Sequence, residues 1–78
     1  MTEGELRRAA ILSLARQRGR VCMGDVRGIL PYWHPETLRL DLARLAYEGA
    51  LRPQGRRRWR VYVATAPEPW YTNGYMMG

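Results

Sequence analysis

Four arginines gather in one short stretch of the chain. Arg56, Arg57, Arg58 and Arg60 fall within five residues, interrupted only by Trp59. Like charges at this spacing repel one another, so the run is best explained by a polyanion that lies against it. Guanidinium groups bind phosphate oxygens, and one of them can enter a narrow minor groove, where the negative potential is enhanced. We therefore expect these arginines to contact nucleic acid; the alternative is a solvated edge strand whose charges only discourage aggregation.

The charge of the whole chain agrees with such a partner. Its 78 residues carry a formal net charge of +6 and a pI near 10.4, with 13 arginines and no lysine. Codon bias or adaptation to high temperature is an alternative explanation for the missing lysine, but it does not explain why arginines cluster. A chain this short makes one small domain with a thin core, so we expect oligomerisation to add buried area.

Few other side chains could perform chemistry. The single cysteine, Cys22, excludes an intramolecular disulfide, and together with the single histidine, His34, it supplies too few ligands for a tetrahedral metal site. No serine or cysteine has a plausible histidine base, and the carboxylates are spread as solubilising charges on helix surfaces. We expect no enzyme, no metal and no cofactor. Cys22 is interpreted as a buried small hydrophobe, with a redox switch as the weaker alternative.

The beginning of the chain indicates an intracellular protein. Residues 1–5 include two acidic side chains where a secretory signal would be basic, and no apolar run reaches the length that crosses a bilayer. We expect a soluble, cytoplasmic protein with no membrane partner. No ligand-binding domain accompanies the one domain, so no small-molecule ligand is expected.

The apolar pattern predicts three helices. Glu3 to Arg18 has acidic residues in its first turn, arginines in its last turn, and Gly19 as a stop. A short extended piece at residues 21–23 is followed by a helix from Gly24 to Leu30, which is short because it carries two glycines. The clearest helix runs from Pro35 to Glu48, because proline is well tolerated at the first helical position and Gly49 follows the last turn.

Two helix faces are predicted to form the core. In the first helix, Leu6, Ala10, Ile11 and Leu14 share one face, whereas Leu12 and Ala15 fall outside it. This surplus of apolar surface favours a homodimer. In the third helix, the expected core stripe is Leu38, Leu42 and Leu45.

A β-hairpin and a tail complete the predicted order. Ala50 to Pro53 and Arg58 to Ala64 read as two strands joined by a turn, so the arginine run lies at the tip and on the outgoing strand. Residues 65–78 form a tail rich in aromatic residues and methionine, which we expect to pack on the domain or on a second subunit. In the second strand, we expect Trp59, Val61 and Val63 to face inward and Arg58, Arg60 and Tyr62 to face outward.

Two segments resemble a known family. Residues 10–21 and residues 34–51 are similar to the first and third helices of bacterial and archaeal winged-helix transcription regulators, especially DeoR-like ones. The resemblance implies an α+β winged helix-turn-helix domain over residues 1–64, with a β-hairpin wing after three helices. It further implies a small regulator that binds double-stranded DNA as a homodimer, with the third helix in the major groove.

The third helix departs from that family pattern in three ways. His34 stands where serine or threonine is usual before the Pro-Glu-Thr step, so it either caps the helix or faces the ligand. The linker from Leu30 to His34 is about one residue longer than usual, and Leu40 stands where a charged or polar residue is common. The candidate DNA-binding residues of this helix are His34, Thr37, Arg39, Leu40 and Arg44. The alternative is a protein-binding stripe formed by Leu40, Ala43 and Tyr47.

Overall fold

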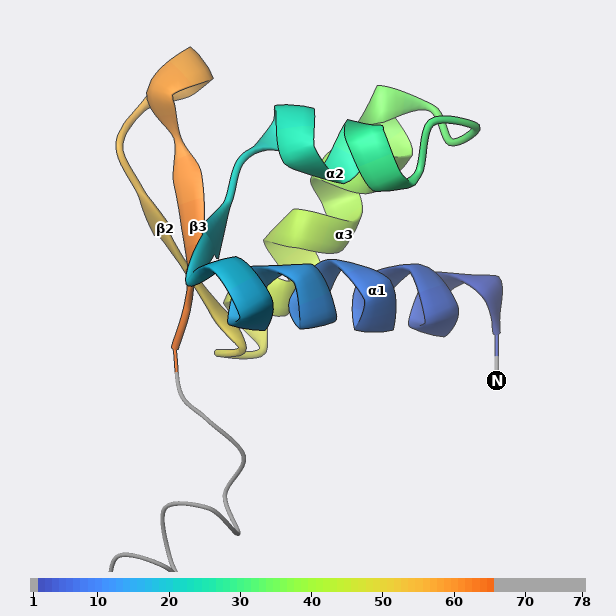
Figure 1. The fold of residues 1–78 in the computed structure, drawn as a ribbon, viewed down its shortest axis with the longest axis horizontal. Helices are drawn as coiled ribbons and strands as arrows, with labels where there is room; N and C mark the ends of the chain where they lie inside the picture. Colours follow the sequence, from blue (N-terminus) through green and yellow to red (C-terminus); the bar gives the residue numbers. More distant parts are fainter. Residues whose placement is uncertain (1, 66–78) are drawn as a thin grey trace, which may run out of the picture.

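The computed structural model describes residues 2–65, which form an α+β domain of three helices and one three-stranded antiparallel sheet (Figure 1). In chain order the elements are α1 (Glu3–Arg18), β1 (Arg20–Val21), α2 (Met23–Ile29), α3 (Pro35–Tyr47), β2 (Leu51–Gln54), a 3-10 turn η1 (Arg57–Trp59) and β3 (Val61–Ala64). The predicted α+β class is confirmed, and each helix ends within one residue of its predicted bounds. Within residues 2–65, no helix is both long and apolar enough to cross a membrane. Beyond Thr65, the predicted tail lies outside the described residues.

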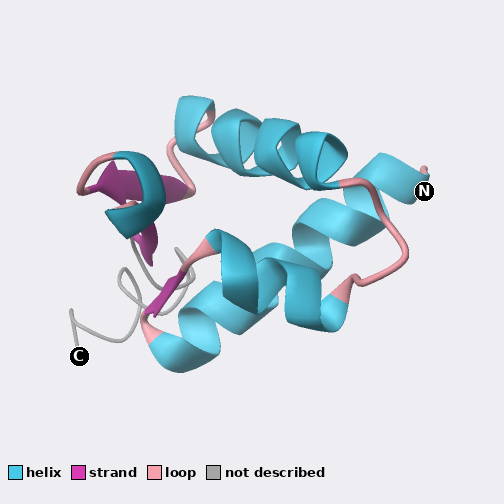
Figure 2. Ribbon diagram, turned by 90° about the horizontal axis from the view of Figure 1, so that it is seen from above, coloured by secondary structure: helices cyan, strands magenta, loops and turns pink. Residues whose placement is uncertain are grey.

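Local signals fix both ends of α1. The Thr2 hydroxyl accepts a hydrogen bond from the Glu5 N–H at 3.2 Å, and the Glu5 carboxylate accepts one from the Thr2 N–H at 2.8 Å, so each satisfies a free N–H of the first turn. Gly19 ends the helix with a φ of 89°, a left-handed conformation that glycine adopts without a steric penalty. Arg20 then begins β1, which places the sheet at the C-terminal end of α1 (Figure 2).

The sheet has the order β1-β3-β2, so the last strand of the described chain lies at its centre. Tyr62 of β3 is opposite Val21 of β1 on one side and Pro53 of β2 on the other. The Ala64 N–H donates to the Gly19 carbonyl at 3.1 Å, which ties the end of β3 to the end of α1. Because all three strands pair through β3, the sheet is complete only when β3 is in place.

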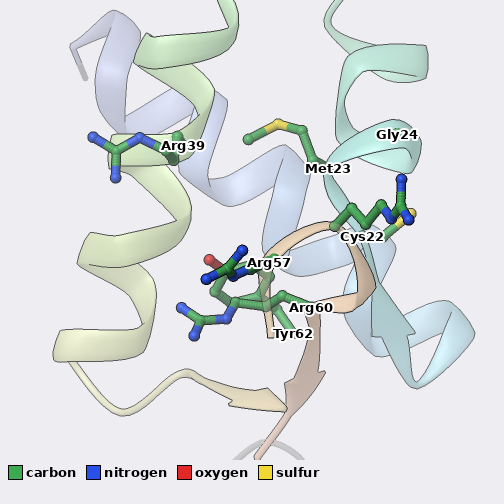
Figure 3. Close-up of a pocket in the computed structure, with 8 residues that line it drawn as sticks. Cys22, Met23, Gly24, Arg39, Arg57, Arg60 and Tyr62 are labelled. Atoms are coloured by element: carbon green, nitrogen blue, oxygen red, sulfur yellow. The ribbon is translucent and has the colours of Figure 1, made fainter. Parts of the chain in front are cut away.

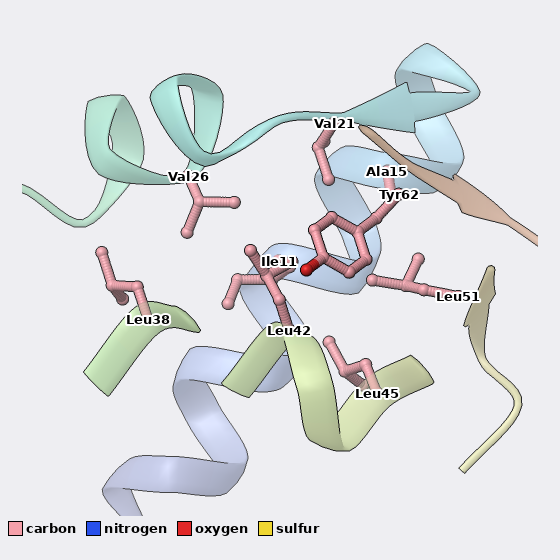
Figure 4. Close-up of a cluster of buried hydrophobic side chains, with 9 residues drawn as sticks. All are labelled: Ile11, Ala15, Val21, Val26, Leu38, Leu42, Leu45, Leu51 and Tyr62. Carbon is pink, nitrogen blue, oxygen red and sulfur yellow. The ribbon is translucent and has the colours of Figure 1, made fainter. Parts of the chain in front are cut away.

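The core lies between the three helices and the inner face of the sheet (Figure 4). All three leucines predicted for the core stripe of α3 are buried, which confirms that helix face. Among residues 2–65, the buried apolar side chains are Ile11, Ala15, Val21, Val26, Leu38, Leu42, Leu45, Leu51 and Tyr62.

The predicted core face of α1 is only partly correct. Ile11 is buried as expected, but Ala15 is also fully buried, although it was predicted to lie outside the face, and Leu6 is 55% exposed. Ile11 and Ala15 are one turn apart, so the fully buried part of α1 lies in its second half. Leu6 lies in the first half of α1 and is not part of the buried core.

The second strand of the hairpin differs from its prediction in both its start and its face. Residues 57–59 form η1, and β3 begins only at Val61. Tyr62 is buried, whereas Trp59 is 76% exposed, so the prediction that Trp59, Val61 and Val63 face inward is wrong. The tyrosine ring offers more apolar area than valine and fills the space between β1 and β2 in the core (Figure 4). Val61 and Val63 are half-buried on the other face.

One carboxylate is buried, contrary to the prediction that the acidic residues are solubilising surface charges. The Asp41 side chain on α3 is 4% exposed, and its oxygens accept hydrogen bonds from Arg7 Nε at 2.6 Å and from Arg8 Nη1 at 3.2 Å. The Arg7 guanidinium also lies over the ring of Trp33, 4.1 Å from its centroid. These contacts link the first half of α1 to α3 and to the turn that precedes it, where apolar packing is thin.

Candidate nucleic-acid interface

The hairpin tip, residues 55–60, is a compact turn with a defined backbone. The Trp59 N–H donates to the Arg56 carbonyl at 2.9 Å, and the Arg60 N–H donates to the Arg57 carbonyl at 3.0 Å. Gly55 has a φ of 81°, and Arg57 has a φ of 54°, an uncommon left-handed conformation for a residue with a side chain. All six residues of the tip are exposed. The fold therefore holds the four arginines of the run at one protruding turn.

Three of these arginines meet α3 across one hollow. Arg57, Arg58 and Arg60 line an open groove of about 450 Å³ together with Arg39 of α3. Figure 3 shows Arg39, Arg57 and Arg60 among the lining residues. The remaining lining residues are Cys22, Met23, Gly24 and Tyr62. We call this hollow the basic groove. It lies between the hairpin tip, α3 and the start of α2, and its four guanidinium groups make it a place for a polyanion.

Arg39 carries a partner on its own helix. Arg39 Nε donates to Glu36 Oε1 at 3.1 Å, and Nη2 donates to the other oxygen of the same carboxylate. The hydrogen bonds from Arg39 lower the pKa of Glu36, and the carboxylate in turn raises the pKa of Arg39. These contacts engage the edge of the guanidinium formed by Nε and Nη2, and Nη1 takes no part in them.

Arg44 lies on the opposite flank of α3. Its Nε donates to Glu48 Oε2 at 3.1 Å, one turn further along the helix. Hydrogen bonds from Thr2 and, to a smaller extent, the positive charges of Arg8 and Arg44 lower the pKa of Glu5. Arg39 and Arg44 therefore flank the outward face of α3 on two sides, and only Arg39 lines the basic groove.

His34 caps α3. Its Nδ1 accepts a hydrogen bond from the Glu36 N–H at 3.0 Å, which satisfies one of the free N–H groups at the start of the helix. The ring is exposed, so the alternative that it faces a ligand stays a prediction. Thr37 is half-buried, and Leu40 is 54% exposed on the outward face. His34, Thr37 and Leu40 do not line the basic groove, and neither does Arg56.

Sequence reasoning missed part of the groove lining. Met23 and Gly24 begin α2, and their approach to the hairpin tip depends on how α2 packs, which no local pattern reveals. Tyr62 was placed on the wrong face, although its size argued for burial. Cys22 is half-buried and not fully buried, and its thiol donates to Asp25 Oδ2 at 3.4 Å.

The basic groove offers positive charge to an extended anion. Within the described residues, no three His, Cys, Asp or Glu side chains are grouped to hold a metal ion. No protein-family profile, curated protein or solved structure was found to match this chain. The resemblance to winged-helix regulators therefore stays a prediction, and the basic groove is characterised by its own geometry alone.

Proposed function

We propose that this protein is a winged helix-turn-helix domain that binds double-stranded DNA as a small transcription regulator. The observation that carries the proposal is the basic groove, whose lining combines Arg39 of α3 with Arg57, Arg58 and Arg60 of the hairpin tip. A helix and a basic hairpin that present charge to one side can contact adjacent stretches of one phosphate backbone. The three helices followed by a hairpin are compatible with this fold.

In the proposed complex, α3 lies in the major groove. Leu40 and Ala43 are exposed on the face opposite the core, where they can contact thymine methyl groups. Arg39 and Arg44 lie on the two flanks of that face, so they can reach phosphates on the two walls of the groove. The hairpin tip, acting as the wing, then follows the backbone into the neighbouring minor groove, with Arg56 at its start.

The test is the salt dependence of duplex binding. Replacing Arg57 and Arg58 together by alanine should weaken binding to every duplex sequence and flatten the slope of log affinity against log salt by about 1 to 2 units, because each lost phosphate contact releases about 0.9 fewer counterions. An unchanged slope would show that the hairpin tip does not touch DNA, and it would overturn the proposal.

A matched control removes the same charge elsewhere. Arg20 of β1 and Arg52 of β2 both lie opposite Val63 in the sheet, are exposed, and do not line the basic groove. The double replacement of Arg20 and Arg52 by alanine should change the salt slope less than the hairpin-tip variant does. Equal effects of the two variants would mean that net charge, and not the groove, drives binding.

The second candidate is a protein-interaction module of a larger assembly. It is favoured by the outward stripe of α3, where Leu40 is 54% exposed and Tyr47 is 92% exposed with Ala43 between them. The arginines that flank this stripe each pair with a glutamate, Arg39 with Glu36 of α3 and Arg44 with Glu48 at the end of the helix, which lowers the net charge around the stripe. In this case the stripe binds a helix or a sheet of a partner protein, and the arginines of the hairpin tip keep the protein soluble.

A homodimer is part of the proposal. Leu6, Leu30 and Trp33 line a small hollow of about 270 Å³ beside the first turns of α1, and the exposed part of Leu6 is apolar surface that a second copy can cover. Selection of bound fragments from a random DNA pool tests this symmetry, because a dimer should enrich an inverted repeat with half-sites about one helical turn apart. Enrichment of single half-sites would indicate a monomer.

A further inference from the structure

Trp59 is a large aromatic side chain that the fold leaves in the open. It is 76% exposed at the hairpin tip, between Arg58 and Arg60, and the Arg58 guanidinium lies 5.7 Å from its ring centroid. Tyr62 fills the place in the core that a ring from this hairpin could occupy. The indole therefore serves neither core packing nor strand alternation.

The backbone that carries this indole forms a defined turn. Trp59 closes a 3-10 turn through its N–H to the Arg56 carbonyl. On the other side of the tip, the Gly55 Cα approaches the Trp59 carbonyl so closely that a Cβ at Gly55 would lie 2.7 Å from that oxygen. A side chain on a turn this tightly defined loses little backbone freedom when it binds, which favours a role in recognition.

The charges next to Trp59 in the sequence indicate which class of ligand the indole contacts. Arg56, Arg57, Arg58 and Arg60 flank Trp59 in the sequence, and no acidic residue lies within residues 49–65. A polyanion that also offers flat aromatic faces matches both features, and nucleic acid is such a polymer. Stacking of a base on an aromatic side chain is independent of base identity because every base has a π-face.

The duplex must offer an open base face for this contact. Inserting an aromatic ring between two stacked base pairs costs the free energy of unstacking them, whereas a base at a duplex end or an unpaired base is already open. We propose that Trp59 stacks on such an open base while the arginines around it hold the flanking phosphates, so that the protein prefers interrupted duplexes to fully paired ones. This inference rests on the proposed DNA binding and names the form of DNA that the hairpin tip favours.

The test compares two covalently closed circular duplexes, which have no ends, that differ only by one unpaired adenine. The full chain should bind the interrupted duplex about 5- to 150-fold more tightly, the ratio that corresponds to about 1 to 3 kcal/mol of stacking. Trp59→Ala should bring the ratio of the two affinities close to 1, and Trp59→Phe should restore part of it. Tyr32→Ala is the matched control, because it removes a ring that is 98% exposed in the turn before α3, and it should leave the ratio unchanged.

A spectroscopic readout reports on stacking itself. With 2-aminopurine as the unpaired base, the wild-type protein should quench its emission, and Trp59→Ala should not. Circular dichroism and thermal unfolding confirm that each variant is folded. A preference that survives Trp59→Ala, or emission that is quenched equally without the indole, would overturn the inference.

The failure of this inference differs from the failure of the proposed function. If the paired duplex binds with the arginine-dependent salt slope but the ratio is near 1, DNA binding stands and the stacking role falls. If neither duplex binds, both proposals fall. If the protein instead binds vesicles of anionic lipid in a way that depends on Trp59, and shows no preference between the two duplexes, the exposed indole belongs to a membrane-binding surface. That result would overturn the inference.

Discussion

Arg7 and Asp41 join the first and third helices through a hydrogen bond of 2.6 Å between Nε and Oδ2, at a carboxylate that is almost fully buried. Arg8 donates to the other carboxylate oxygen at 3.2 Å, and the ring of Trp33 lies against the Arg7 guanidinium. One side chain of α3 is therefore held by two residues of α1, while the turn before α3 is held by one of them. The orientation of the proposed recognition helix depends on this polar cluster as well as on its leucines.

Removing the Asp41 carboxylate should destabilise the protein. Asp41→Ala leaves two guanidinium groups without their acceptor, and we expect a loss of about 3 kcal/mol in the free energy of unfolding, the lower end for a broken buried pair because both arginines keep some contact with water. Urea unfolding measures the loss. Glu48→Gln, which breaks an exposed pair on the same helix, should change stability by less than about 0.5 kcal/mol. Similar losses in both variants would show that Asp41 is not specially placed.

The corrected face of β3 makes a second prediction. Tyr62→Ala should cost about 3 to 5 kcal/mol, because it removes a buried ring and leaves a cavity between β1 and β2. Trp59→Ala should stay within about 1 kcal/mol of wild type, since its ring is exposed. Thermal or denaturant unfolding of the two variants compares them directly. A larger loss for Trp59→Ala than for Tyr62→Ala would show that Trp59 faces the core, as the sequence pattern predicted.

Two glycines should respond in opposite ways to alanine. Gly55→Ala adds a Cβ next to the Trp59 carbonyl at a positive φ, so it should destabilise the protein by more than about 1 kcal/mol and distort the hairpin tip. Gly28→Ala adds a Cβ in open space on α2, so it should stabilise by about 0.5 to 1 kcal/mol through helix propensity. Unfolding curves measure both changes, and a stabilising Gly55→Ala would contradict the tight turn described above.

The pH dependence of stability should report on Asp25. The Cys22 N–H donates to Oδ2 of Asp25 at 3.0 Å and lowers the pKa of this carboxyl below its ordinary value of 3.8. A depressed pKa in the folded state means that the ionised form stabilises the fold above the unfolded pKa and that this contribution is lost as the pH falls through the folded one. Asp25→Asn should therefore be less stable than wild type at neutral pH. The difference should shrink below about pH 4 and vanish once both pKa values are passed. A difference that is constant across this range would mean that the charge of Asp25 is not involved.

Leu40→Arg separates the two candidate functions of α3. If this helix lies in the major groove, the added guanidinium should reach a phosphate and steepen the salt slope of duplex binding by about 0.9, or shift base preference at one position by about 1 to 3 kcal/mol. If the stripe of Leu40, Ala43 and Tyr47 grips a protein, the same change buries an unpaired charge and abolishes that contact. Measuring duplex affinity and partner capture on this one variant decides between them, and loss of a protein partner with no change in DNA binding would reject the DNA proposal.

The third helix could be predicted closely because its signals are local. Pro35 at the first helical position, the leucines at helical spacing and Gly49 after the last turn are all read within fifteen residues. Each of these signals acts through the backbone or through one face of one helix, so no tertiary contact is needed to interpret them. The same holds for Gly19 at the end of α1.

The residues that sequence reasoning misplaced depend on distant partners. Asp41 is buried because Arg7 and Arg8, more than thirty residues earlier, supply its hydrogen bonds. Trp59 is exposed because the arginine run forms a 3-10 turn, which interrupts the alternation that a continuous strand would have imposed. The groove between Arg39 and the hairpin tip arises only from the packing of α2 and α3 beside the sheet. The sequence therefore predicted that these arginines bind nucleic acid, but it could not predict that they lie around one groove.

The place of β3 at the centre of the sheet has a consequence for how the chain folds during synthesis. β3 is the last described element to leave the ribosome, yet β1 and β2 pair only with it. Arg20 of β1 therefore has no strand partner until Val63 of β3 has been synthesised. Such long-range pairing requires the closure of a large loop, which is slow compared with helix formation. A nascent chain that stops before Tyr62 lacks the ring that closes the core, so the three helices gain their fixed arrangement only after the hairpin has been synthesised.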